Sequence, residues 1–295
     1  MRTFKPFLLF GATLCLLAAC KDTVPEDENA ANTDSTKPKV VAIVKGEHGR
    51  GPDSATLVVK TPAKDEVVGK DSVKVIVDLQ GYMLGLPTEG EQSQGINYSK
   101  DGQHIHVIID DKPYMAMYDP EGFMTPPLPE GPHTLRAFPS RSWHESLKMP
   151  GAFVAHTFYV GKKEGEPALK EGAPLLTYSR PKGDYKEKDA QKVLLDFYIS
   201  NCELGKDKYK VIASIDGQVK DTLTEWVPYF IEGLSDGEHT VKLQLIGPDG
   251  QPIPGAFNSP EEKIRINPTT PAAAPAATHQ HDSGMKHDSG KGEVK

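Results

Sequence analysis

The 295-residue sequence lacks three things: an excess of positive charge, a helical pattern and a catalytic motif. It carries 34 Lys and Arg against 41 Asp and Glu, and its formal net charge is −7. Such an acidic balance argues against nucleic acid as a partner. No strand-turn-helix segment carries a nucleophilic serine, and Ser142 and His144 are too close in the chain to face one another in a triad. We therefore expect a protein that is not an enzyme.

Cysteine is scarce too, and two of the three cysteines lie within the first 20 residues. A basic start is followed by an apolar run from Phe7 to Leu17, too short to span a bilayer, and by Leu17-Ala18-Ala19-Cys20. These features resemble the signal peptide and lipobox of bacterial membrane lipoproteins. The resemblance implies that residues 1–19 are removed and that Cys20 carries acyl chains such as palmitate, which anchor the protein to a membrane.

This anchor has two further consequences. With Cys15 removed and Cys20 lipidated, Cys202 has no partner for an intrachain disulfide, so stability must come from packing. The residue after the lipidated cysteine is Lys21 rather than aspartate. By resemblance to enterobacterial lipoprotein sorting, this favours the outer membrane of the cell envelope if the cell is Gram-negative.

The rest of the sequence contains an internal repeat, in which matched blocks recur in the same order. The clearest pairs are Lys70–Asp78 with Lys188–Asp196, Leu128–Leu135 with Leu234–Val241, and Pro150–Phe153 with Pro254–Phe257. We therefore predict two copies of one domain. The predicted segments are domain 1 at 55–162, a linker at 163–173 and domain 2 at 174–267.

Each copy consists of short β-branched or alternating runs separated by Gly, Pro and Asp turns. In the first copy, strands are expected at 56–60, 72–80, 104–110, 114–118, 133–138 and 153–160, with a weaker one near 123–128. This spacing is typical of an antiparallel β-sandwich. The repeated Leu-x-x-Gly-x-His-Thr segment resembles bacterial immunoglobulin-like and fibronectin-like modules. The fold class is therefore predicted as all-β, with two tandem antiparallel immunoglobulin-like β-sandwiches.

The segments that flank the repeats are polar or rich in Pro and Ala. Residues 20–54 are predicted to form a flexible tether, and residues 268–295 a disordered, histidine-containing tail. Within the tail the candidate metal ligands are His279, His281, Met285 and His287. Imidazole suits Cu and Zn, and thioether favours Cu(I), so the tail resembles the His/Met tracts of periplasmic copper-handling proteins. The alternative is a solvated end whose histidines are incidental.

A second candidate lies on the strand that contains His104 and His106. Alternation along that strand places Ile105, Val107 and Ile109 inside the sandwich and both histidines outside. Two residues apart on a strand, the histidines would lie roughly 6.5 to 7 Å apart, close enough to share a metal or an anion.

The third candidate is the loop around Trp143, which has no counterpart in the second copy, where 247–250 is a plain turn. The predicted ligand-binding patch consists of His104, His106, Arg136, Arg141, Trp143 and His144. The alternative is that exposed histidines are unremarkable and that Trp143 only covers the sandwich end. His133 and His239 occur in both copies, so they are predicted to be structural.

Two functions follow from these features. The first is a membrane-anchored envelope lipoprotein that binds or scaffolds a partner, such as an envelope protein, without catalysis. The second is a metal-handling lipoprotein that holds Cu or Zn with the tail and with His104 and His106. A weaker idea is a glycan-binding module in which Trp143 and an exposed Tyr98 or Tyr114 form the stacking surface.

Overall fold

The structure is a computed structural model that describes residues 40–52, 54–90 and 96–267. Within these ranges the only helical turns are η2 (Pro150–Ala152) and η3 (Glu187–Ala190), so the predicted all-β fold is confirmed. No helix in the described ranges has the length and apolarity that a membrane span requires. The lipobox with Cys20 and the tail histidines lie outside the described residues.

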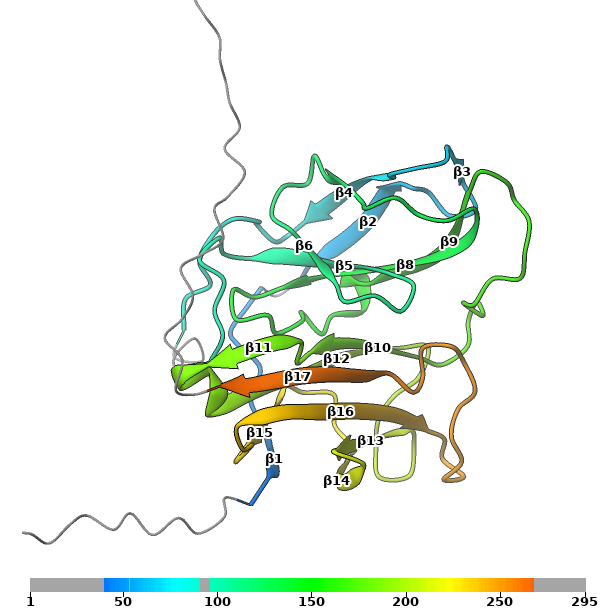
Figure 1. Cartoon of the computed structure of the whole chain (residues 1–295). Helices are drawn as coiled ribbons and strands as arrows, with labels where there is room; N and C mark the ends of the chain where they lie inside the picture. The colour runs from blue at the N-terminus through cyan, green and yellow to red at the C-terminus, as the bar shows by residue number, and fades with distance from the viewer. Residues whose placement is uncertain (1–39, 53, 91–95, 268–295) are drawn as a thin grey trace, which may run out of the picture. The chain divides into compact units, whose positions relative to one another are not determined.

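The first sandwich contains every strand expected in the first copy (Figure 1). Its smaller sheet has the order β2-β4-β7, and its larger sheet has the order β3-β9-β8-β5-β6. All pairs are antiparallel except β3 with β9. The strand bounds are β2 Thr56–Thr61, β3 Val67–Val68, β4 Lys74–Gln80, β5 His104–Ile109, β6 Met115–Met117, β7 Phe123–Met124, β8 Gly131–Ser140 and β9 Val154–Val160.

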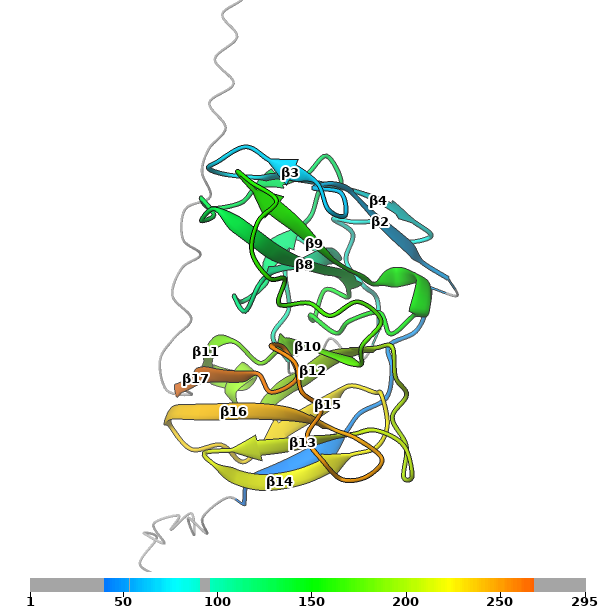
Figure 2. The same cartoon turned by 90° about the vertical axis from the view of Figure 1, so that its right-hand side faces the viewer.

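The second sandwich is likewise built from two sheets, which Figure 2 shows as separate layers. The sheet orders are β1-β15-β12-β10 and β11-β17-β16-β13-β14, and only β11 with β17 is parallel. The strand bounds are β1 Ala42–Lys45, β10 Leu175–Arg180, β11 Gly183–Lys186, β12 Lys192–Ser200, β13 Lys210–Ile215, β14 Gln218–Leu223, β15 Tyr229–Glu232, β16 Gly237–Ile246 and β17 Glu261–Asn267.

Strand β1 corrects the predicted tether at 20–54, because residues 42–45 of that segment pair with β15 of the second sandwich. The strand-like alternation of this short run lets Ile43 pack against the second core. Without β1, β15 would be an edge strand with unpaired backbone N–H and C=O groups. The flexible-tether prediction is therefore wrong for residues 42–45.

The alternation predicted for β5 is confirmed. Ile105, Val107 and Ile109 lie in the first core, as Val211, Ala213 and Ile215 do in the second. The repeated histidines also behave alike. His133 Nδ1 lies 2.7 Å from Asp110 Oδ2, and His239 Nδ1 lies 2.7 Å from Asp216 Oδ2. The same bond in both copies indicates a structural role.

The outer face of the first sandwich's larger sheet is covered by the second sandwich. His106 Nδ1 lies 3.0 Å from Ser179 Oγ on β10, and Lys182 Nζ donates to the Tyr114 carbonyl at 2.7 Å. Lys148 and Asp196 form an ion pair between the sandwiches, and both side chains are almost completely buried. Side chains that point out of β5 and β8 on this face therefore do not face water.

Candidate metal centre

Three imidazoles from two parts of the first copy converge on one point. His104 Nε2 lies 3.0 Å from His106 Nε2 and 3.0 Å from His144 Nδ1. One nitrogen of each ring lies within 4.8 Å of the others. We refer to His104, His106 and His144 as the trihistidine cluster. These three residues belong to the predicted ligand-binding patch, and in the structure their rings are in direct contact.

Strand alternation and a tight loop position the cluster. His104 and His106 lie on the same face of β5, opposite Ser140 and Phe138 of β8. The loop after β8 closes when the His144 N–H donates to the Arg141 carbonyl at 2.8 Å. His144 has a φ of 69°, in the left-handed region that residues other than glycine seldom adopt. Such strain at a single residue is typical of functional sites, and here the loop carries the His144 ring to His104.

The predicted exposure of these histidines is wrong. His104 and His106 are 0% exposed and His144 is 8% exposed. Alternation along a strand predicts only which side chains point away from the core of their own sandwich. It does not predict that the second sandwich packs on that outer face.

All three rings are neutral at physiological pH. Burial lowers the pKa of His104 to about 4, although its bond to the Gly102 carbonyl works against this. Burial also lowers the pKa of His106 and His144 well below the usual range, and the positive charges of Arg180 and Lys182 act in the same direction. Neutral imidazole is the form that ligates metal ions, so no proton has to leave before an ion can bind.

Two nitrogens at the point of convergence compete for one acceptor, His104 Nε2. His104 Nδ1 lies 2.8 Å from the Gly102 carbonyl, which can only accept, so the proton is on Nδ1 and Nε2 has a lone pair. That single lone pair faces two imidazole nitrogens at 3.0 Å. The Tyr114 hydroxyl accepts from Arg180 and can donate its own proton to His144 Nδ1, 3.2 Å away. His144 Nδ1 then has no proton to donate to His104 Nε2 across their 3.0 Å contact, and a cation that took the place of the Tyr114 proton would bridge the two nitrogens.

The surroundings hold the rings in place. Ser179 Oγ can accept a proton from His106 Nδ1, which would free His106 Nε2 for a metal. The Tyr114 ring stacks on His106 with a centroid distance of 3.5 Å and an interplanar angle of 7°. A β-bulge between Tyr178 and Arg180 interrupts the register of β10 beside Ser179. The second sandwich therefore supplies part of the site.

Sequence reasoning missed Ser179 and Arg180 as parts of the site and treated Tyr114 as exposed, although it is buried. One signal could have found β10: residues 175–179 have no charged side chain on either face. A strand that can be buried on both faces can lie between two layers.

The other residues of the predicted patch do not join the cluster. Arg136 lies over the Phe257 ring at 4.0 Å, and Arg141 donates to the Gly49 and Gly51 carbonyls at 2.6 and 2.7 Å. Trp143 is 1% exposed and donates from Nε1 to the Glu145 carboxylate at 2.8 Å. The predicted single patch is therefore three separate groups.

The same burial corrects the predicted stacking surface for a glycan. Trp143 and Tyr114 are buried, and Tyr98 is half-buried. A glycan partner stays a prediction that these residues do not support.

No family model and no curated protein matches the chain. Similar solved structures include the fibronectin(III)-like modules of CbhA from Clostridium thermocellum, with 11% identity over 77% of this chain and 100% of that chain and a TM-score of 0.25. SGBP-B of the Bacteroides ovatus mixed-linkage glucan utilization locus, solved with a mixed-linkage heptasaccharide, has 11% identity over 71% of this chain and 47% of that chain, with a TM-score of 0.21. The Ig1-2 module of the Drosophila receptor phosphatase DLAR has 10% identity over 72% of this chain and 98% of that chain, with a TM-score of 0.22. Likeness at this level says nothing about function.

Proposed function

We propose that the protein is a non-enzymatic binding protein of the bacterial cell envelope, anchored through Cys20, that takes up a copper or zinc ion at the trihistidine cluster. One observation carries the metal assignment. The only lone pair of His104 Nε2 faces two imidazole nitrogens at 3.0 Å. The lipobox resemblance supports the envelope location.

The donor set fits these metals. Neutral imidazoles suit Cu and Zn, whereas Mg and Ca prefer oxygen ligands. In a tetrahedral zinc site with Zn–N bonds of about 2.0–2.1 Å, the ligand nitrogens lie about 3.3 Å apart. The 3.0 Å contacts in the cluster therefore need to open by only a few tenths of an ångström.

Three protein ligands leave one coordination position open, which distinguishes an exchangeable site from a closed structural one. His144 is the only member of the cluster with measurable exposure, so an ion would enter on its side. We assign His279, His281, Met285 and His287 an auxiliary role, in which the tail collects ions weakly and delivers them to the cluster.

The test is a competition titration of the chain from Lys21 with Cu(I), Cu(II) and Zn, beside a chain that ends at Pro268. We expect at least one ion to bind both proteins more tightly than about 1 μM, the range where incidental coordination begins. Replacing His104 or His144 by Ala should weaken that binding at least about 100-fold, or about 2.7 kcal/mol. His48→Ala, a change at an exposed histidine, should leave it unchanged.

Two results would overturn the proposal. One is that neither protein binds any of the ions more tightly than about 1 μM. The other is that binding is lost with the tail alone, which would show that the buried histidines take no part.

A further inference from the structure

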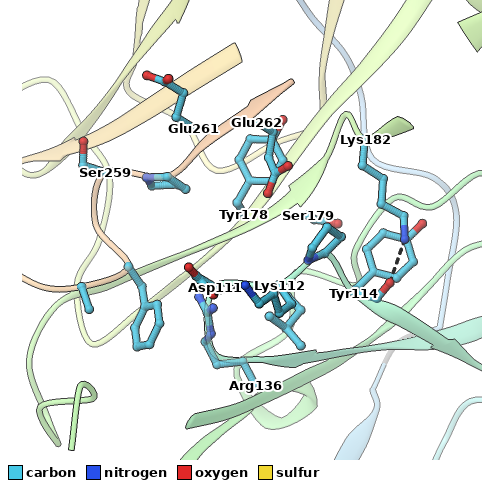
Figure 3. A pocket seen from close by; sticks show the side chains of 15 residues that line it. Asp111, Lys112, Tyr114, Arg136, Tyr178, Ser179, Lys182, Ser259, Glu261 and Glu262 are labelled. Carbon is cyan, nitrogen blue, oxygen red and sulfur yellow. Dashed lines mark hydrogen bonds and ion pairs between the residues drawn. The ribbon is translucent and has the colours of Figure 1, made fainter. Parts of the chain in front are cut away.

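A pocket of about 270 Å³, shown in Figure 3, lies between the two sandwiches. Two of its lining residues, Tyr114 and Ser179, also contact the trihistidine cluster. The pocket's charged lining from the first sandwich is Asp111, Lys112 and Arg136, of which Asp111 and Lys112 pair with each other at 3.4 Å, and from the second it is Lys182, Glu261 and Glu262. Its volume is near the lower end of the range for small-molecule sites. Charged side chains of both signs line its walls.

Arg136 is a buried cation that lacks a direct ion pair, although Asp110 and Asp111 lie near enough to raise its pKa against the effect of burial. Its side chain is 4% exposed, and among the described residues it forms no ion pair. One guanidinium nitrogen donates to the Asp110 carbonyl, while Nε has no partner. The Asp110 carboxylate is itself bonded to His133 and to the backbone N–H of Thr134. An unpaired charge in such a position costs stability, so its presence favours a role with a ligand.

Lys182 adds a second positive charge to the same pocket. Its ammonium lies 3.5 Å from the centroid of the Tyr114 ring and donates to the Tyr114 carbonyl, as Figure 3 shows. No carboxylate of the described chain pairs with it directly. Burial and the nearby Arg180 lower the pKa of Lys182 to about 8. A bound anion would stabilise both Lys182 and Arg136.

The opposite wall is acidic. Glu261 and Glu262 begin β17, and in Figure 3 they lie across the pocket from Arg136. No ion pair within the described ranges joins these glutamates to Arg136 or Lys182. Burial raises the pKa of Glu262 and Asp111 acts in the same direction, whereas the positive charge of Lys182 acts against them. Unlike charges therefore face each other across the pocket without contact.

We propose that this pocket binds a small zwitterion of amino-acid size, whose carboxylate pairs with Arg136 and Lys182 and whose ammonium pairs with Glu262. A guanidinium is the side chain best suited to a carboxylate, because its N–H groups form parallel bonds to both oxygens. A simple anion would leave Glu262 unpaired, and a simple cation would leave Arg136 unpaired. This inference does not depend on the metal site.

The experiment is a calorimetric and thermal-shift screen of the full chain, from Lys21 to Lys295, with each of the twenty common amino acids. We expect at least one to bind with a Kd below about 1 mM. The amide of that amino acid, which lacks the carboxylate, and its N-acetyl form, which lacks the ammonium, should each bind at least about tenfold more weakly. Acetate and inorganic phosphate should bind more weakly still.

Two variants test the assigned residues separately. Arg136→Met and Glu262→Gln should each weaken binding of the amino acid at least about tenfold. Arg136→Met should not lower the melting temperature of the free protein, because it removes a buried charge that has no direct ion pair. Arg265→Gln serves as the control, since Arg265 lies on β17 in an exposed pair with Glu238.

Several results would overturn the inference. These are a screen with no binding below about 1 mM, equal binding of acetate or phosphate, or unchanged affinity in both pocket variants. A lower melting temperature of Arg136→Met would show that Arg136 serves the fold instead.

Discussion

The two sandwiches have similar cores and differ on the outer face of one strand. The inward residues of β5 and β13 are alike, with Ile105 and Val107 in the first copy and Val211 and Ala213 in the second. The outward positions differ, because His106 on β5 is fully buried against Ser179, whereas Ile212 on β13 is half-buried. The residues that specify the fold are repeated, and those of the candidate site are not.

The loops that follow β8 and β16 show the same contrast. After β16, Gly247 donates to the Gln251 carbonyl at 2.8 Å and closes a plain turn. After β8, residues 141–146 are buried and carry His144 to the cluster. The first copy therefore has a candidate site at the position where the second has a turn.

The largest effect should come from separating the two sandwiches. Lys148→Met leaves the Asp196 carboxylate buried without its partner, which we expect to cost about 3–5 kcal/mol of unfolding free energy. Urea denaturation measures this. Lys45→Met, in the exposed pair with Glu225, is the control and should change little. A small loss in Lys148→Met would mean that the two copies are energetically independent.

Metal affinity should depend on the histidines that occur only in the first copy and not on those that occur in both copies. His106→Ala should weaken Cu or Zn binding at least about 100-fold. His239→Ala should have no effect, because His239 bonds to Asp216 instead. Ser179→Ala should weaken binding about tenfold, since it removes the partner of His106 Nδ1. Equal losses in the His106 and His239 variants, measured by chelator competition, would contradict the distinction.

The two kinds of histidine should also respond to pH with opposite sign. Burial lowers the folded pKa of His104 to about 4, below its usual 6.5. At pH 7 the imidazole is neutral in both the folded and the unfolded chain, so it has little effect on stability. As the pH falls, the unfolded chain binds the proton first, which lowers the free energy of unfolding of the metal-free protein by about 2 kcal/mol between pH 7 and pH 5. Burial disfavours the charged form of His239 as well, but the bonds to Asp216 and Ser235 outweigh this effect and raise its pKa. His239 therefore contributes to folding stability below pH 6.5, and this contribution is lost at higher pH.

Urea denaturation of two variants at pH 5 and pH 7 checks this difference. His104→Phe should lose less stability on acidification than the parent protein, and His239→Gln should lose more. The same change in both variants would contradict it.

The smallest effect concerns the segment before β2. A Cβ added at Gly49 would lie 2.4 Å from Arg141 Nε and 2.6 Å from the Trp143 ring. Gly49→Ala should therefore destabilise the protein by about 1–3 kcal/mol. Gly69→Ala, where nothing lies within 4 Å of the added atom, is the matched control. If thermal unfolding of the two variants is the same, the segment does not pack on the first copy's loop.

Much of the fold could be predicted from the sequence because the cause is local. Turn residues mark the strand ends, and alternation along β5 places Ile105 inside and His106 outside. What His106 meets outside is set by Ser179, 73 positions away, and no pattern along one strand contains that information. The pairing of Ala42 with Glu232 depends on distant sequence in the same way. The site was therefore predicted in composition but not in burial.

The most direct test of the metal assignment is anomalous diffraction at the copper or zinc edge, from crystals grown with that ion. We predict a peak at about 2.0–2.1 Å from His104 Nε2, His106 Nε2 and His144 Nδ1, with the His104 contacts widened from 3.0 Å toward about 3.3 Å. A peak found only at surface residues or the tail, with the three imidazoles unmoved, would contradict it.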